Sequence, residues 1–398
     1  MRICIVTIAA PVHGLGGMQD HTRDLARGLA ATGNQVEVIT ARHPNGLREV
    51  EEDGVLWRFV DAPGRHLDRT WLAASAAAFA DAGGASAFDV VHGEGSSALG
   101  LLRNGVHHEV PLVTMFHGNY VGLVKAALGR ARKGHTLVEA RYLVRLAQDH
   151  FPRGNWWRFH ACEAIVPSRQ QLRDTCLSHL LDPHRVHVVP NGVDTSVFRP
   201  RRQEDARREL RLPTDRPLVV AAGRLNREKG FGVAIRALGE VRDRSTRLLI
   251  VGDGEERRAL ERLAEEIGLS TRVSFEGARP HAELATYIAA ADAFVFPTER
   301  DEAAPLVLPQ AMACGVPVIA SATGGIPEVL DRPGESGLLV PAGDVRALTT
   351  AIDTVIGDRH LAARLGEGAR RRIAAEYTAE RMVARTLDVY GVAAAKAA

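Results

Sequence analysis

The chain has 398 residues, of which 45% are hydrophobic and 25% charged, and its formal net charge is +2. This is the ordinary composition of a soluble globular protein, and at roughly 150 residues per domain the length predicts two or three domains. So small a net charge gives no reason to expect a nucleic-acid partner.

The chain begins with one charge, at Arg2, and a short apolar run that ends at Pro11. A run this short, followed by a glycine cluster, indicates a buried first strand and not a signal peptide. No stretch approaches the ~18 apolar residues of a membrane-spanning helix. The cysteines form no C-x-x-C pair, which favours reduced, mostly buried thiols in a cytoplasmic protein over a zinc site or a disulfide scaffold. The four cysteines are Cys4, Cys162, Cys176 and Cys314.

Short β-branched runs alternate with longer amphipathic stretches along the chain, which is typical of parallel α/β sheets. The strands predicted in the first half are residues 3–8, 35–39, 89–92, 112–116, 164–166 and 186–189. Those predicted in the second half are residues 218–221, 248–251, 273–275, 293–296, 318–320 and 337–340. The predicted helices include residues 20–31, 231–242, 255–267, 281–290, 306–313 and 379–396. So many strands exceed one comfortable doubly wound sheet, and we expect two sheets of about six strands each.

The division between the two sheets is predicted near residues 198–215, which are strongly polar and punctuated by prolines. We expect two Rossmann-like domains, residues 1–198 and residues 199–378, with the C-terminal helix at residues 379–396 packed back on the first. Two such domains would face each other across a central cleft. Because open α/β sheets bind ligands beyond the carboxyl ends of their strands, functional residues are expected in the loops after strands.

The loop after the first predicted strand is rich in glycine and precedes a helix. Glycines let a backbone approach a ligand, and the amino end of a helix offers free N–H groups to an anion. The dinucleotide fingerprint G-x-G-x-x-G fails here because Gln19 occupies the place of its third glycine. A ligand-free turn and an anion-binding loop containing Gly16 and Gly17 remain equally open.

The first strand of the second half is followed by the loop Gly223–Gly230, in which Arg224 and Lys229 flank a turn before a helix. The amino end of a helix is an unfavourable place for cations. Their presence favours an anion such as a diphosphate, bound bidentately by the arginine and as a point charge by the lysine, over two solvated surface cations. Residues 252–254 follow the next strand, and there we favour a ligand-free turn in which Asp253 or Gly254 caps the following helix.

His117 follows a predicted strand and has a glycine beside it, Gly118. A lone histidine is usually structural. The loop position raises this one to a candidate that faces the cleft.

The segment of residues 298–320 carries the longest motif of the chain. It has an acidic residue, Glu302, and after seven further residues Gln310 and the run A-M-A-C-G-V-P-V-I-A at residues 311–320. This resembles the signature of the retaining glycosyltransferases of family 4, which have the GT-B fold. The family pattern has a second glutamate where this chain has Gln310.

Further motifs in the same order extend the resemblance along most of the chain. The residues that match are Gly16-Gly17, the P-N-G-V-D stretch at residues 190–194, Gly223-Arg224 with Lys229-Gly230, and residues 323–328 and 337–340. Residues 121–160 match no motif of the family.

The resemblance implies an α/β protein of the GT-B fold, with two Rossmann-like doubly wound parallel-sheet domains. It implies a hexosyltransferase that moves a sugar from a nucleoside-diphosphate sugar, most often a UDP-sugar, to a hydroxyl acceptor with retention of configuration. The favoured picture is front-face attack, which depends on positioning and charge stabilisation and needs no covalent residue. No metal and no further cofactor are implied, because the arginine–lysine pair and a helix amino end already neutralise the diphosphate.

The resemblance also assigns roles to individual residues. The catalytic centre would contain His117, Glu302, Arg224 and Lys229. The donor would be bound by Gly16, Gly17, Gly223, Arg224, Lys229, Gly277, Arg279, Glu302, Ala304, Pro305, Leu306, Val307 and Gln310. The acceptor, a small molecule, lipid or glycan, would meet Gly17, His117 and Asn119.

Two observations leave alternatives open. Gln310 keeps one acceptor oxygen for a ribose hydroxyl but loses the charge of glutamate, so a relative that binds nucleotide sugar with weak or no transfer is the alternative. A GT-B phosphorylase or epimerase would use the same cleft differently.

Residues 121–160 hold eight basic and two acidic residues, a net charge of +6. They form either a solvated helical face or a surface for an acidic acceptor or for peripheral contact with the inner face of the membrane.

Overall fold

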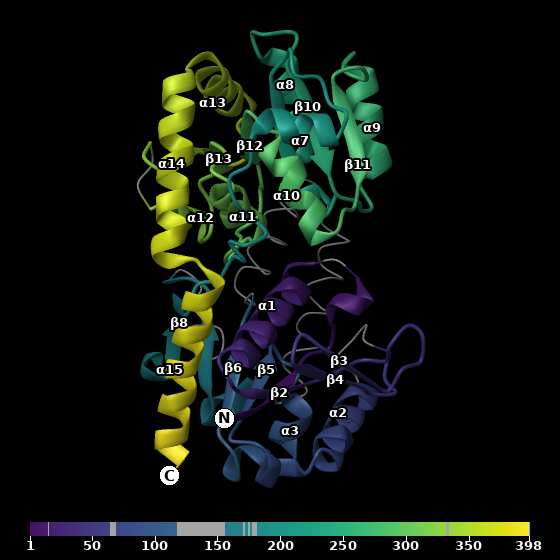
Figure 1. Cartoon of the computed structure of the whole chain (residues 1–398), viewed down its shortest axis with the longest axis vertical. Helices are drawn as coiled ribbons and strands as arrows, with labels where there is room; N and C mark the ends of the chain where they lie inside the picture. The colour runs from purple at the N-terminus through teal and green to yellow at the C-terminus, as the bar shows by residue number, and fades with distance from the viewer. Residues whose placement is uncertain are drawn as a thin grey trace. The chain divides into compact units, whose positions relative to one another are not determined.

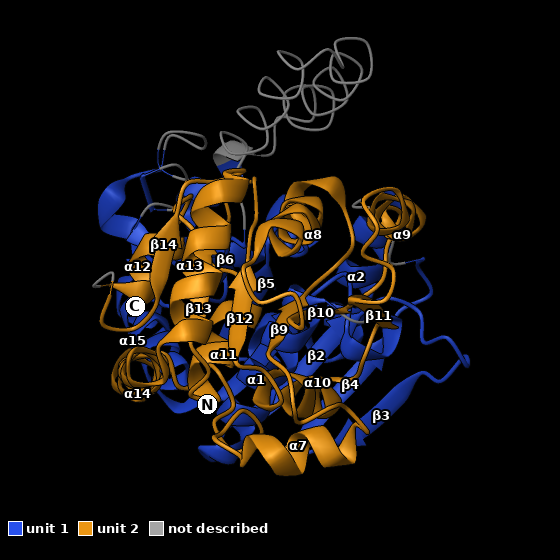
Figure 2. Ribbon diagram, turned by 90° about the horizontal axis from the view of Figure 1, so that it is seen from above, with its two compact units in different colours: residues 1–192, 379–398 blue, residues 193–378 orange. Residues whose placement is uncertain are grey.

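The structure is a computed structural model, and it describes residues 1–14, 16–63, 69–117, 156–169, 172–173, 176, 181–331 and 334–397. The chain divides into two compact units, coloured separately in Figure 2. The first unit contains Met1–Gly192 and Ala379–Ala398, and the second contains Val193–Thr378. Asn119 and residues 121–155 lie outside the described residues.

The first unit is built on an eight-stranded sheet with the order β3-β4-β2-β1-β5-β6-β7-β8. Its strands are β1 (Arg2–Val6), β2 (Gln35–Thr40), β3 (Glu49–Glu52), β4 (Val55–Phe59), β5 (Val90–Glu94), β6 (Leu112–Met115), β7 (Glu163–Val166) and β8 (Val186–Val188). All neighbouring strands are parallel except the antiparallel pair β3 and β4. The six strands predicted in this half are confirmed, but the hairpin β3–β4 was not predicted.

The hairpin β3–β4 was missed although its turn has a sequence signal. Asp53 and Gly54 connect the strands and both have positive φ, 53° and 75°. Asp-Gly is a favoured pair for such a two-residue turn because its twist matches that of the strands. The prediction of about six strands for this sheet was therefore wrong by one edge hairpin.

Helices cover both faces of the first sheet. The helices are α1 (Gly17–Ala31), α2 (Arg69–Asp81), α3 (Leu99–Arg103) and α15 (Ala379–Ala397), with short 3₁₀ turns at Pro11–His13, Gly84–Ala87, Val106–His108, Trp156–Ala161 and Pro183–Arg185. Helices α1 and α15 lie side by side on one face, over Ile3 and Ile5 (Figure 1). They approach closely at Gly28, where an added Cβ would lie 2.4 Å from a methyl group of Val383. Helices α2 and α3 cover the other face.

The second unit contains a six-stranded sheet with the order β11-β10-β9-β12-β13-β14, in which every neighbouring pair is parallel. Its strands are β9 (Leu218–Ala222), β10 (Arg247–Val251), β11 (Val273–Gly277), β12 (Ala293–Phe296), β13 (Val318–Ser321) and β14 (Leu338–Val340). The helices are α7 (Gln203–Glu209), α8 (Phe231–Glu240), α9 (Arg257–Glu266), α10 (His281–Ala289), α11 (Val307–Ala313), α12 (Ile326–Leu330), α13 (Val345–Gly357) and α14 (Arg359–Glu376), with a 3₁₀ turn at Arg227–Lys229. The predicted second sheet is confirmed, and so is the class of two parallel α/β sheets.

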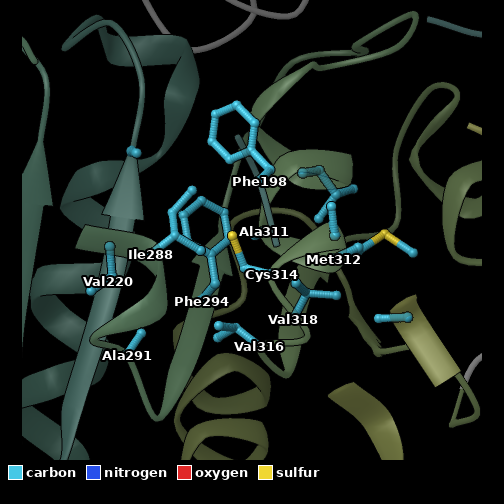
Figure 3. Packing of buried hydrophobic residues seen from close by; sticks show 14 of the residues in the cluster. Phe198, Val220, Ile288, Ala291, Phe294, Ala311, Met312, Cys314, Val316 and Val318 are labelled. Carbon is cyan, nitrogen blue, oxygen red and sulfur yellow. The ribbon is translucent and has the colours of Figure 1, made fainter. Parts of the chain in front are cut away.

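Two apolar layers hold the second unit together, one on each face of its sheet. Successive residues of a strand point to opposite faces, so Phe294 lies in one layer while Ala293 and Val295 lie in the other. Figure 3 shows the first layer, where Phe294 packs with Ile288 of α10 and Met312 of α11. Full burial of one such side chain stabilises the fold by roughly 1.5–3 kcal/mol.

None of the described helices is both long and apolar enough to cross a lipid bilayer.

Candidate active site

The order of the second sheet creates a switch point between β9 and β12. From β9 the chain proceeds to β10 and β11 on one side, whereas β12 leads to β13 and β14 on the other. In open α/β sheets, ligands bind at such a point, beyond the carboxyl ends of the strands. The two loops that leave this point, after β9 and after β12, contain the predicted residues Arg224, Lys229 and Glu302.

Lys229 and Glu302 meet at the switch point. The Lys229 Nζ lies 2.8 Å from Glu302 Oε1, and the two side chains are 20% and 15% exposed. The same ammonium lies 5.3 Å from the centroid of the Phe296 ring, at the end of β12. An ammonium binds anionic oxygens and a carboxylate accepts from hydroxyls, so the pair suits a ligand that carries both groups.

Main-chain contacts join the loop after β9 to the loop after β12. The carbonyl of Glu228 accepts from the N–H of Glu299 at 2.8 Å and from the hydroxyl of Thr298 at 3.1 Å. Gly230 has φ 69°, and an added Cβ there would lie 1.9 Å from the carbonyl oxygen of Pro297. Only glycine fits this position, and the close approach brings Lys229 within reach of Glu302.

The loop after β13 holds the backbone of Glu302. The N–H of Gly325 donates to the Glu302 carbonyl at 2.7 Å. Gly324 has φ 55°, and an added Cβ would lie 2.3 Å from the same carbonyl oxygen. The hydroxyl of Thr323 donates to the carboxylate of Asp301. The T-G-G motif therefore positions the Glu302 loop.

The Arg224 loop rests on the glycine loop after β10. The N–H of Leu225 donates to the Asp253 carbonyl at 2.9 Å, and an added Cβ on Gly252 would lie 1.9 Å from the Gly223 carbonyl oxygen. The N-cap of α9 is Glu256, so the prediction that residues 252–254 cap this helix was wrong. Their glycines instead permit the two loops to touch. The Arg224 side chain is exposed and makes no ion pair with any residue that the structure describes.

Gly277 and Arg279 lie at the edge of the sheet. Gly277 ends β11 and Arg279 follows it by two residues, and strand β10 separates β11 from β9. The Arg279 guanidinium lies 3.6 Å from the carboxylate of Glu276 and 3.7 Å from that of Glu283. No contact among the described residues joins Arg279 to Lys229 or Glu302, whereas Gly277 accepts from the N–H of Gly252, which touches the Gly223 loop.

The segment after Glu302 leads into a short helix. Ala304 and Pro305 precede Leu306, which is the N-cap of α11, and Val307 is its first residue. Gln310 lies on α11 and is 5% exposed. A polar side chain this deeply covered needs hydrogen-bond partners, from the protein or from a ligand.

In the first unit, three predicted residues lie beyond the carboxyl ends of β1 and β6. Gly16 is the N-cap of α1 and Gly17 its first residue. His117 follows β6 by two residues, and its Nε2 is hydrogen-bonded to Glu94 at the end of β5. Glu94 was missed by the sequence analysis, although a carboxylate two residues after a predicted buried strand was a usable signal.

The protonation of this pair follows from its surroundings. Burial by itself raises the pKa of the Glu94 carboxyl, but His117 favours the ionised carboxylate, and that pKa lies well below its usual range. Burial lowers the pKa of His21 to about 3, so its ring is neutral near neutral pH. The ionised carboxylate has no proton to give. The hydrogen bond therefore runs from the Nε2–H of His117 to Glu94.

Among the described residues, one group has the composition of a metal site. His21, Glu94 and His117 have ligand atoms that all lie within 4.8 Å of one another. A tetrahedral zinc ion with bonds of about 2.0–2.2 Å needs ligand atoms about 3.4 Å apart. Because Nε2 of His117 already bonds Glu94, the geometry fits a carboxylate–histidine pair better than a metal centre.

Comparisons with known proteins agree with this geometry. The sequence profile of the glycosyl transferases group 1 matches residues 202–372, and that of glycosyltransferase family 4 matches residues 15–197. The D-inositol 3-phosphate glycosyltransferase 1 of Catenulispora acidiphila is 32% identical over 400 residues, which cover 94% of this chain and 90% of that protein. The D-inositol 3-phosphate glycosyltransferase of Frankia alni is 32% identical over 388 residues, covering 90% of each chain.

Solved structures show the same architecture. Sucrose-phosphate synthase from Thermosynechococcus elongatus superposes with a TM-score of 0.80 at 27% identity, over 99% of both chains. Anabaena HepE superposes with a TM-score of 0.76 at 19% identity, over 98% of this chain and 100% of the other. The resemblance found in the motifs is thereby confirmed. The chain belongs to the family 4 glycosyltransferases, and its two parallel-sheet units are those of the GT-B fold.

Proposed function

We propose that this glycosyltransferase moves a hexose from a UDP-sugar to a hydroxyl acceptor with retention of anomeric configuration. The contact of Lys229 with Glu302 at the switch point carries the proposal. It places a cation for a diphosphate beside a carboxylate for sugar hydroxyls. Glycine contacts on both loops hold the two residues together.

Each member of the pair has its own role in the proposed transfer. Lys229 and the exposed Arg224 bind the diphosphate and stabilise the charge that grows on it as the sugar departs. Glu302 accepts hydrogen bonds from the sugar hydroxyls and so fixes the orientation of the sugar. Two cationic side chains supply the positive charge that a metal ion would otherwise provide, so the transfer that we propose is metal-independent.

Retention follows from attack on the face that the diphosphate leaves. The bond between the anomeric carbon and the diphosphate oxygen breaks while the acceptor oxygen bonds to the same face. The acceptor proton passes to the departing phosphate, so no base on the protein is needed. His117, with Gly17, would lie beside the sugar and the acceptor, where its ring can hydrogen-bond the reacting region.

UDP is the first choice of nucleotide. Anabaena HepE was solved with UDP and glucose and with UDP-glucose, at 19% and 20% identity to this chain. In our proposal, Gln310 meets the ribose of the nucleotide, where its amide can both accept from and donate to hydroxyls.

The acceptor is proposed from the relatives. Those with 32% identity are named D-inositol 3-phosphate glycosyltransferases, so a phosphorylated cyclitol is the acceptor to test first. A lipid or the end of a glycan is the next choice. The net charge of +6 in residues 121–160 suits an acidic acceptor of any of these kinds.

The decisive experiment is a screen of nucleotide sugars by thermal shift, followed by transfer assays with the donors that stabilise the chain. We expect release of nucleoside diphosphate with an acceptor present, in EDTA, and the α configuration of the donor in the product. Phosphate-dependent release of sugar 1-phosphate would indicate a phosphorylase instead. Donor binding without turnover on any acceptor would indicate a binding protein.

Contact with a membrane surface is a separate part of the proposal. Sedimentation with vesicles of anionic lipid, compared with vesicles of neutral lipid, measures it directly. We expect binding to anionic vesicles that 0.5 M salt abolishes, because the interaction is electrostatic. Equal binding to both vesicle types would contradict it.

A further inference from the structure

Three histidines lie beside the buried carboxylate of Glu94 in the first unit, and a tyrosine contacts one of them. Oε2 accepts from Nε2 of His117, while Oε1 lies 3.6 Å from Nε2 of His21 and 3.6 Å from Nε2 of His92. The rings of His21 and His117 meet edge to face, with centroids 4.8 Å apart. The hydroxyl of Tyr390 lies 2.8 Å from Nδ1 of His92.

These side chains come from distant parts of the chain. His92 and Glu94 alternate along β5, so both point to the face of the sheet that α1 and α15 cover. Helix α1 brings His21 to this face, and the C-terminal helix α15 brings Tyr390. The side chains of His21, His92 and Glu94 are at most 3% exposed, whereas His117 is 22% exposed. Among the described members of the cluster, His117 is the one that reaches solvent.

The hydrogen bond between Tyr390 and His92 shows which nitrogen of His92 carries the ring proton. Burial, and then the charge of Glu94, raise the pKa of the Tyr390 hydroxyl well above its usual range, so Tyr390 keeps its proton and donates it to Nδ1 of His92. Nε2 of His92 then carries the ring proton and turns it toward Glu94. Oε2 of Glu94 is therefore hydrogen-bonded to His117, while Oε1 faces Nε2 of His92 at 3.6 Å, too far for a hydrogen bond.

We infer that Glu94 is a positioning residue for His117, and the inference rests on the proposed function of His117 beside the transferred sugar. The carboxylate holds the Nε2–H of His117 and so fixes one ring orientation and one tautomer. Because Nε2 of His117 is bonded to Glu94, Nδ1 is the ring nitrogen that can contact the substrate. Tyr390 fixes the ring of His92, which lies beside Oε1 of Glu94, and this links the C-terminal helix to the site.

The inference explains why an ionised carboxylate is tolerated at this fully buried position of β5. An ionised carboxylate without partners would be expensive to bury, and here it accepts the N–H of His117. The same sheet contains a second carboxylate–histidine pair for comparison: Glu163, at the amino end of β7, accepts from His187 at 2.7 Å and from Lys396 at 2.9 Å.

A double-mutant cycle tests the inference with the full chain. Glu94→Gln should lower kcat about 10- to 100-fold, as loss of the carboxylate partner of a functional histidine does elsewhere, and leave the Kd for the donor unchanged. His117→Ala should lower kcat further, and Glu94→Gln should then add nothing in the His117→Ala background. Equal losses in both backgrounds would overturn the inference.

Two control variants separate positioning from stability. Glu163→Gln removes the charge of the matched carboxylate–histidine pair and should leave kcat unchanged even if it lowers the melting temperature. Tyr390→Phe removes only a hydroxyl and should lower kcat less than Glu94→Gln does. A loss with Glu163→Gln as large as with Glu94→Gln would show a general effect of stability and would overturn the inference.

A spectroscopic test needs no substrate and therefore stands apart from the proposed function. In protein with ¹⁵N-labelled histidine rings, a resonance assigned by its absence in His117→Ala should show protonated Nε2, and Glu94→Gln should shift it. An unchanged resonance would overturn the inference even if sugar transfer is observed. Stabilisation of the native chain by zinc, lost in Glu94→Gln, would overturn it in favour of a metal site.

Discussion

Lys229 Nζ lies 2.8 Å from Glu302 Oε1, although the two residues are 73 positions apart in the chain. The contact joins the loop after β9 to the loop after β12. In the function that we propose, Lys229 meets the diphosphate and Glu302 the sugar, so a bound donor would meet two groups that already lie side by side.

Variants of Lys229 and Glu302 should lose interactions with different parts of the donor. Lys229→Ala should reduce the affinity for both nucleoside diphosphate and nucleotide sugar and lower kcat/KM by about 10²–10³-fold, because a preorganised charge partner of the leaving group is gone. Glu302→Ala should lower kcat/KM similarly but leave the Kd of the free nucleoside diphosphate unchanged. Calorimetry with both ligands measures the difference. Full turnover in both variants would contradict the proposed function.

Gly230→Ala tests whether the close approach of the two loops is obligatory. The new Cβ would lie 1.9 Å from the Pro297 carbonyl oxygen at φ 69°. The left-handed backbone alone costs about 1–2 kcal/mol, so the melting temperature should fall by several degrees. Gly239→Ala in the same region is the control: it lies in α8, meets only a Leu269 methyl at 3.6 Å, and should be neutral or slightly stabilising.

Gln310→Glu tests the departure from the family pattern. A carboxylate accepts stronger hydrogen bonds from ribose hydroxyls, so the Kd for the nucleotide should fall about 5-fold, which corresponds to about 1 kcal/mol. Because position 310 is only 5% exposed, the same change should lower the melting temperature of the ligand-free chain. Gln310→Leu, which has no acceptor, should weaken binding. Identical nucleotide affinity in all three proteins would show that residue 310 does not meet the ribose.

The buried ring of His21 predicts a loss of stability in acid. Burial lowers its pKa to about 3, against about 6.5 in the unfolded chain. Between these values the unfolded chain binds a proton that the folded chain does not. The free energy of unfolding should therefore be greatest above pH 6.5 and fall by up to about 1.4 kcal/mol per pH unit below it.

His21→Phe is the variant that isolates this contribution. It has no titrating group at position 21, so the melting temperature should depend less on pH than in the parent protein. The window from pH 6.5 to about 4.5 is the one to compare, because the carboxyl groups begin to titrate below it. Parallel profiles for the two proteins would refute the assignment.

The cysteines should react slowly in the folded chain. Burial raises the pKa of Cys162 and of Cys314 to about 12, and it raises that of Cys4 further. Burial also raises the pKa of the half-buried Cys176. The thiolate is the reactive form of cysteine, so a disulfide reagent at pH 8 should modify at most one thiol per native chain quickly. We expect Cys176 to be the first to react. The same reagent in denaturant should modify four. Rapid reaction of several thiols in the native protein would contradict their burial.

The predicted strands were found because their runs are short, β-branched and bounded by turn residues. Such local patterns depend on neighbours in the sequence, so they can be seen without a structure. Strand β3, with the sequence E-V-E-E, is mostly exposed and charged and carries little of the apolar signal on which the prediction depended. Strand β4, with the sequence V-L-W-R-F, does carry that signal and was overlooked. The Asp53-Gly54 turn between the two strands was a further clue.

The sequence by itself determined the class of the chain, two parallel α/β sheets with the motifs of family 4 in order, because glycine loops and buried strands are local features. It also named Lys229, Glu302 and His117 as candidates. Tertiary structure alone decided that Lys229 pairs with Glu302 and that Glu94 holds His117. Those contacts join residues of different strands, and strand order and register, which bring them together, arise from long-range packing that no local pattern specifies.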